Sequence, residues 1–174
     1  MLPTNAFEIG AGHVHIRAAL DPGLVYDVGF DDYVCFLCGL NYTQQQIQIM
    51  TNNASSCTNL TTQQPGDLNY PSFSVVFKPL DLVRVTSRIV TNVGAAVSVY
   101  KVTVDNPPNV NITVEPTTLV FKEQNEKQSY TVRFESKIAS SNSSSGLQEF
   151  GQIWWRCVKG GTQVVHSPVV IAWE

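Results

Sequence analysis

Histidine and aspartate side chains gather near the start of the chain, where they could supply a general base and its acid partner. His13 and His15 precede four aspartates: Asp21, Asp27, Asp31 and Asp32. Imidazole is the side chain that general acid–base catalysis uses most often. No serine or cysteine has the sequence context of an activated nucleophile, and the glycines around His13 favour a tight turn. We therefore predict a structural role for His13 and no catalytic residue in this chain.

The cysteines offer a second kind of chemistry, and there are four of them: Cys35, Cys38, Cys57 and Cys157. The C-x-x-C spacing of Cys35 and Cys38 occurs in redox and zinc proteins. The redox interpretation needs a strand–helix–strand context that is missing, and zinc needs a second ligand pair. Phe36 and Leu37 indicate a buried helix face instead, so we expect no metal and no cofactor. Four cysteines allow three disulfide connectivities, and a Cys35–Cys157 pair stays open.

Tryptophan and arginine side chains could line a ligand surface. Trp154 and Trp155 are adjacent, so alternation along a strand places them on opposite faces. We expect core packing for at least two of the three tryptophans, the third being Trp173. Arg84 and Arg88 share one strand face, which we expect to be solvated.

Composition limits the functional classes. Charged residues make up 14% of the 174 residues, and the net charge is -3. No run of Lys or Arg could drive nucleic-acid binding, and no apolar run approaches the roughly 20 residues that span a bilayer. Asn-x-Ser/Thr sequons are dense, which favours secretion and predicts glycosylation at Asn41, Asn53, Asn59, Asn111 and Asn142. The first residues do not form a signal peptide, so we expect a chain cut from a longer secreted precursor.

Helical signals dominate the first third of the chain. Asp31 or Asp32 can cap one short helix, and Thr43 with Gln46 forms a capping box that opens another. Two short helices bury little surface by themselves, so we expect this segment to pack against something absent from the chain. Residues 51–67 are rich in polar residues and are predicted to be a connection.

From Tyr70 onward, apolar residues alternate with a period of two. The clearest strand contains Tyr130, Val132 and Phe134, and turn residues such as Gly160-Gly161 separate such strands. Seven or more short strands fit an immunoglobulin-like or fibronectin type III sandwich. We therefore predict a mainly β fold, in which a fibronectin type III-like β-sandwich follows a short α-helical segment.

Long motifs run along nearly the whole sequence. They are Gly10–Val14 (GAGHV), Ala19–Asp27 (ALDPGLVYD), Asp67–Phe73 (DLNYPSF) and Arg88–Gly94 (RIVTNVG). Their order and content resemble the C-terminal part of plant subtilisin-like serine proteases, the cucumisin-type subtilases. His15 and Ile16 depart from the Asn-Pro pair that is usual after GAGHV in that family. The resemblance is specific because several long motifs occur in the family's order.

This resemblance implies a domain organisation. Residues 1–63 would be the C-terminal end of a subtilisin-like peptidase domain, and residues 68–174 the fibronectin-III-like domain. The family's Asp, His and Ser triad lies upstream of these motifs, and its Gly-Thr-Ser-Met-Ala segment does not occur here. The resemblance also implies a disulfide between Cys38 and Cys57, which would leave Cys35 and Cys157 as buried thiols.

The resemblance also implies a function. The complete enzyme would be a secreted, apoplastic serine endopeptidase acting by Ser-His-Asp acyl transfer on polypeptides. This chain would be a fragment that is inactive alone, and its partner would be the missing peptidase domain, which it stabilises while shaping substrate access. We expect neither nucleic acid nor membrane as a partner. The alternative is a freestanding β-sandwich that acts as a binding or inhibitory module without protease activity.

Overall fold

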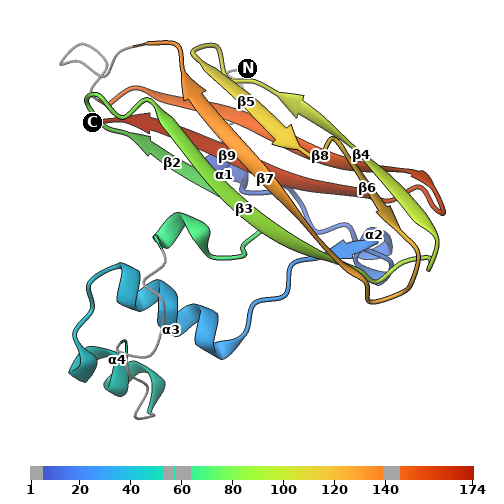
Figure 1. Cartoon of the computed structure of the whole chain (residues 1–174), viewed down its shortest axis with the longest axis horizontal. Helices are drawn as coiled ribbons and strands as arrows, with labels where there is room; N and C mark the ends of the chain where they lie inside the picture. Colours follow the sequence, from blue (N-terminus) through green and yellow to red (C-terminus); the bar gives the residue numbers. More distant parts are fainter. Residues whose placement is uncertain (1–5, 53–56, 58–63, 139–145) are drawn as a thin grey trace.

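Two β-sheets packed face to face form most of the molecule, and short helices precede them (Figure 1). The computed structural model describes residues 6–52, 57, 64–138 and 146–174. The predicted mainly β sandwich with helices near its N-terminus is confirmed. The boundary predicted between residues 63 and 68 stays a prediction.

The first sheet has the strand order β1-β3-β7-β5, with every neighbouring pair antiparallel. Its long central strands show the alternation expected from the sequence. In β7, Tyr130, Val132 and Phe134 are buried in the core, whereas Arg133 and Glu135 are exposed. The bounds are Leu24–Val25 for β1, Val83–Asn92 for β3, Val110–Glu115 for β5 and Lys127–Ser136 for β7.

The second sheet has the order β2-β9-β8-β4-β6, in which only β2 and β9 are parallel neighbours among the described strands. Trp155 and Trp173 are buried in the core, as predicted, and Trp154 lies on the other face of its strand. The Trp155 ring packs edge-on against Tyr130 of the first sheet, with centroids 5.1 Å apart. The bounds are Phe73–Phe77 for β2, Ser98–Asp105 for β4, Thr118–Phe121 for β6, Gln148–Lys159 for β8 and Val164–Trp173 for β9.

The helices are short: α1 (Ala6–Ile9), α2 (Ile16–Leu20), α3 (Phe30–Gly39), α4 (Gln44–Thr51) and the 3-10 turn η2 (Pro65–Asp67). The predicted capping box of α4 is confirmed, because the Gln46 amide donates to the Thr43 hydroxyl and the Thr43 amide donates to the Gln46 side chain. The predicted cap of α3 is wrong. Its N-cap is Gly29, and Asp32 lies inside the first turn, where its carboxylate accepts from the Gly29 amide at 2.7 Å.

Helices α3 and α4 share a small core of their own, separate from that of the sandwich. It consists of Val34, Cys38 and Ile47, with Leu37 and Cys57 packed against it. Cys38 and Cys57 form a disulfide with a Cα–Cα separation of 5.8 Å, the pairing that the resemblance implied. Cys35 is a buried free thiol, as expected, but the expectation is wrong for Cys157, whose free thiol belongs to a partly exposed residue. This core leaves Phe30, Tyr33, Ile49 and Met50 of the two helices exposed.

Candidate functional site: the junction between the N-terminal segment and the sandwich

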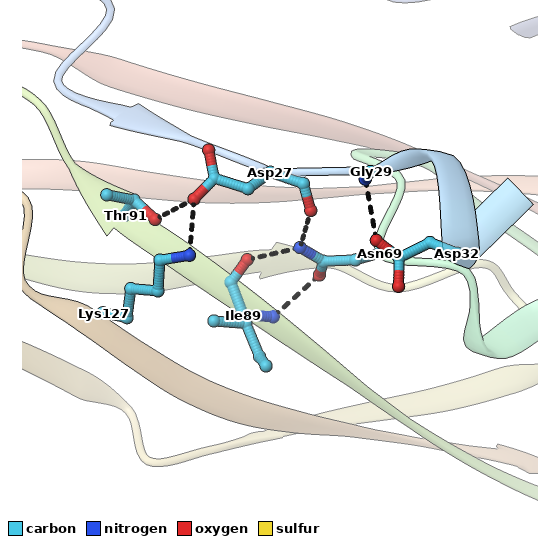
Figure 2. Close-up of polar contacts among 7 residues, drawn as sticks. All are labelled: Asp27, Gly29, Asp32, Asn69, Ile89, Thr91 and Lys127. Atoms are coloured by element: carbon cyan, nitrogen blue, oxygen red, sulfur yellow. Dashed lines mark hydrogen bonds and ion pairs between the residues drawn. The ribbon is translucent and has the colours of Figure 1, made fainter. Parts of the chain in front are cut away.

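A network of polar contacts joins the segment before α3 to the first sheet; we call it the junction (Figure 2). At its centre, the Asp27 carboxylate accepts a hydrogen bond from the Thr91 hydroxyl at 2.5 Å and pairs with Lys127 Nζ at 3.1 Å. The hydrogen bond from Thr91 contributes most to lowering the pKa of Asp27, and the contact with Lys127 lowers it further. The junction therefore ties Asp27, in the segment before α3, to strands β3 and β7.

Asn69 is the second residue on which the junction depends. Its Nδ2 donates to the carbonyl oxygen of Asp27 at 3.0 Å and to that of Ile89 at 2.9 Å, and its Oδ1 accepts from the Ile89 amide at 2.8 Å. The side-chain amide thus pairs with the outward-facing backbone of β3 as a neighbouring strand would. One residue consequently links the segment before α3, the segment before β2 and β3 itself (Figure 2).

Tyr26 anchors the same segment from the inside. Its hydroxyl lies 2.7 Å from the Tyr130 hydroxyl and 3.4 Å from the Ser167 hydroxyl. Burial raises the pKa of both tyrosines, so both remain neutral. Two residues earlier, Leu24 is buried in the sandwich core and pairs with Asn92 across β1 and β3. The N-terminal segment therefore contributes to the sandwich a strand, the core side chain of Leu24 and the partly buried Tyr26 that packs against the core.

Arg88 corrects the expectation of a solvated strand face. Its side chain is buried, its Nε donates to the Tyr70 carbonyl at 2.9 Å, and its guanidinium lies 4.6 Å from the centroid of the Phe73 ring. Burial lowers the pKa of Arg88. Arg84 is partly exposed and pairs with Asp81. The chain from Tyr70 to Ser72 covers Arg88, a long-range contact that strand alternation does not reveal.

A depression of about 720 Å³ lies beside the junction. Residues from β3 form its apolar part, among them Val85 and Ile89, and Asp27, Asp32, Asp67 and Lys127 contribute charge. These polar groups already bond to one another or to backbone: Asp27 with Lys127, Asp32 with Gly29, and Asp67 with Thr86. The arrangement fixes the position of chain segments and presents no activated nucleophile.

The other candidate residues of the sequence do not converge on one site. His13 is exposed, and His15 caps α2 by accepting a hydrogen bond from the Ala18 amide at 3.0 Å. Burial, together with Asp32 and Asp31, raises the pKa of Cys35 and disfavours its thiolate. Over the part of the chain that the structure describes, no three His, Cys, Asp or Glu side chains could hold a metal ion. No described helix is long and apolar enough to cross a membrane.

Of the predicted glycosylation sites, Asn41 and Asn111 are exposed. The remaining three, Asn53, Asn59 and Asn142, lie outside the described residues. Sequence reasoning missed Tyr26, Asn69 and His166, whose surroundings come from distant parts of the chain. His166 stacks on Trp154, with ring centroids 5.6 Å apart. Tyr26 and Asn69 lie in the ALDPGLVYD and DLNYPSF motifs, and this position was the sequence signal that could have identified them.

Comparison with known proteins decides the family. A profile described as "Fibronectin type-III domain" matches residues 67–171, more than half of the chain. The chain belongs to this family. The matched region starts at Asp67, the last residue of η2, and ends in β9, so the fibronectin type-III match includes both sheets except β1. The junction therefore lies where the matched region meets the residues that precede it.

Curated relatives extend the match to nearly the whole chain. Subtilisin-like protease SBT1.7 of Arabidopsis thaliana is 44% identical over 98% of this chain and 22% of its own length. Subtilisin-like protease SBT3 of Solanum lycopersicum is 40% identical over 94% of this chain and 21% of its own length. The resemblance to the C-terminal part of plant subtilisin-like proteases is confirmed. The chain spans about a fifth of the length of these relatives.

Two solved structures are similar to part of this chain at much lower sequence identity. PapD-like domain 7 of human CEP192 has a TM-score of 0.43 and is 12% identical, over 70% of this chain and 96% of that chain. The periplasmic chaperone SfaE has a TM-score of 0.40 and is 9% identical, over 59% of this chain and 56% of that chain.

Proposed function

We propose that this chain is the non-catalytic C-terminal part of a subtilisin-like serine endopeptidase, in which it stabilises the peptidase domain and helps to shape substrate access. The endopeptidase chemistry would belong to the rest of that protein, because the described residues bring together no base, nucleophile and oxyanion site. Relatives of more than four times this length support the proposal, since they are named as subtilisin-like proteases.

The observation that carries the proposal is the exposed apolar surface of the N-terminal segment. In α2 and the loop before it, Val14 is 87% exposed, Ile16 75% and Leu20 83%. Helix α3, its C-cap residue and helix α4 add exposed apolar side chains: Phe30, Tyr33, Leu40, Ile49 and Met50. These two groups lie apart in Figure 1, one at α2 and the other at α3 and α4, and exposed apolar surface of this kind marks an interaction site. A peptidase domain that precedes this segment in the chain would cover this surface.

The junction would give this contact a mechanical role. Because Asp27, Asn69 and Tyr26 bond the segment to the sandwich, a peptidase domain resting on α2 and α3 would be held at a set position relative to both sheets. Each contact that forms only in the folded assembly adds to the stability of both parts.

We further propose a secreted, glycosylated protein. The Cys38–Cys57 disulfide and the dense sequons support it, because disulfides persist in oxidising compartments and N-linked glycans are added in the secretory pathway.

A chimera tests the proposed role. The matching C-terminal region of the Arabidopsis relative SBT1.7 would be replaced by this chain, and secreted proteolytic activity would be compared with that of a version truncated before this region. We expect activity from the chimera and little from the truncated protein. The purified chain alone should not hydrolyse a fluorogenic peptide library.

Substitutions in α2 make the test specific. Within the chimera, Ile16→Asp and Leu20→Asp should abolish secreted activity, because each places a charge in the proposed interface. Arg17→Asp, on the same exposed helix, is the matched control and should retain it. Turnover by the isolated chain would contradict a non-catalytic role. Equal activity of all three variants would contradict the proposed interface and favour the freestanding module.

A further inference from the structure

We propose that Asn111 carries an N-linked glycan and that this glycan shields the free edge of the first sheet. Asn111, Ile112 and Thr113 form a sequon within β5. In the strand order β1-β3-β7-β5, β5 has one strand neighbour, β7, among the described residues. Its other side is therefore an open sheet edge, to which a second polypeptide chain could add a strand.

The alternation of β5 places the sequon on the solvent side. Val110, Ile112 and Val114 are buried in the sandwich core, while Asn111 and Thr113 are exposed. Residues two apart in a strand share a face, so the acceptor amide and the threonine hydroxyl both face away from the core. Within the described part of the chain, the Asn111 side chain forms no hydrogen bond or ion pair that a glycan would break.

The preceding turn covers only the first part of this edge. The Val110 amide donates to the Pro107 carbonyl at 3.3 Å, and the Ile112 amide donates to the Asn106 side chain at 2.8 Å. Beyond Ile112, no such turn or side-chain contact caps the strand in the described residues. The uncovered stretch begins two residues after Asn111, within reach of a bulky hydrated oligosaccharide.

Asn41 provides an internal comparison. It is also exposed and also begins a sequon, with Thr43 as its third residue. The Thr43 hydroxyl is engaged in the capping box of α4, and Asn41 lies at the end of a helix with φ of 61° rather than on a sheet edge. A glycan on Asn41 therefore has no edge to protect, which makes Asn41 a matched control.

This inference rests on the secretory route of the proposed function, and its test separates the two. The full chain would be produced with a cleavable signal sequence in cultured animal cells, so that entry into the pathway does not depend on the native route. Peptide mapping by mass spectrometry before and after N-glycosidase treatment would measure occupancy at Asn111. We expect most of the secreted protein to be modified there. Unmodified Asn111 in folded, secreted protein would overturn the site, whereas failure of the proposed function would instead appear in the chimera assay.

The shielding role is tested separately, by measuring aggregation. Secreted Asn111→Gln and Thr113→Ala both lose the sequon, while Thr113→Ser keeps it and Asn41→Gln removes the other sequon that is exposed among the described residues. We expect the first two variants to aggregate severalfold faster than wild type, by light scattering at equal concentration, and the last two to match it. Wild type and Asn111→Gln made without glycans in bacteria should aggregate equally fast. Equal rates for all secreted variants would overturn the shielding role.

Discussion

The hydroxyl groups of Tyr26 and Tyr130 lie 2.7 Å apart inside the sandwich, although 104 residues separate them in the sequence. Tyr26 lies before the residues of the fibronectin type-III match, and Tyr130 belongs to a central strand within that match. Ser167 of the second sheet lies 3.4 Å from the Tyr26 hydroxyl. The pair therefore joins three parts of the chain at one buried point.

Removing one hydroxyl of this pair should destabilise the fold. Tyr26→Phe leaves the Tyr130 hydroxyl buried without its partner, which typically costs about 1–3 kcal/mol of unfolding free energy. Urea unfolding monitored by tryptophan fluorescence would measure the loss, since Trp155 packs against Tyr130. Tyr42→Phe is the matched control, because the Tyr42 side chain is 41% exposed. Equal losses for the two variants would show that the buried hydroxyl pair contributes nothing.

Asn69→Ala should loosen the junction without unfolding the sandwich. The substitution removes three hydrogen bonds, of which two join Asn69 to β3. We expect a loss of about 1–2 kcal/mol, because these bonds are near the surface and water replaces part of them. Hydrogen exchange would be the sharper measurement: the Ile89 amide should exchange faster, whereas amides of β8 should not change. Unaltered protection of Ile89 would contradict the pairing described here.

The strands were predictable from the sequence because burial imposes a period of two. Tyr130, Val132 and Phe134 face the core as their spacing required, and the Thr43–Gln46 capping box could be read locally. Features that depend on distant chain segments could not be predicted in this way. Strand β1 has only two residues, so its pairing with β3 leaves no periodic signal. Arginine is usually a surface residue, but Arg88 is buried. Its Nε and Nη2 donate to backbone carbonyls of a distant segment, and its Nη1 donates to residues of its own strand.

Asp27 should contribute a small acid-dependent part of the stability. Its pKa is lowered in the folded protein, chiefly by the Thr91 hydrogen bond and then by Lys127. Its stabilising contribution is therefore complete above the unfolded pKa, about 4, and is lost as the pH falls through the folded value. Because the side chain is half-exposed, the effect should stay below about 1 kcal/mol.

The Asp27→Asn variant tests this dependence. Its deficit in unfolding free energy relative to wild type should be largest near neutral pH and should shrink on acidification below pH 4. Added salt should also reduce the deficit at neutral pH, since the contact with Lys127 is exposed to screening. Asp105→Asn, on an exposed strand end with no ion pair among the described residues, is the control. A deficit that is constant with pH would contradict a lowered Asp27 pKa.

His166 should produce a second pH dependence, in a higher range. Burial lowers its pKa, a backbone contact with Ala11 opposes the shift only in part, and its Nε2 atom is buried without a hydrogen bond in the described structure. The Trp154 ring on which it stacks also has the Arg156 guanidinium 5.7 Å from its centroid. A proton on His166 would therefore place a second positive charge against the same ring and is disfavoured in the folded state.

The lowered pKa of His166 determines how the stability changes with pH. The unfolded chain takes up a proton on His166 at higher pH than the folded protein does, so stability is complete above the unfolded pKa, about 6.5, and falls as the pH drops below it. His166→Gln should remove this component, and its urea midpoint should change less between pH 7 and pH 5 than that of wild type. His13→Gln, at an exposed position, should behave as wild type does. If wild type and His166→Gln lost stability equally between pH 7 and pH 5, another group would be responsible. The contribution of Asp27 can be distinguished because it changes only below pH 4.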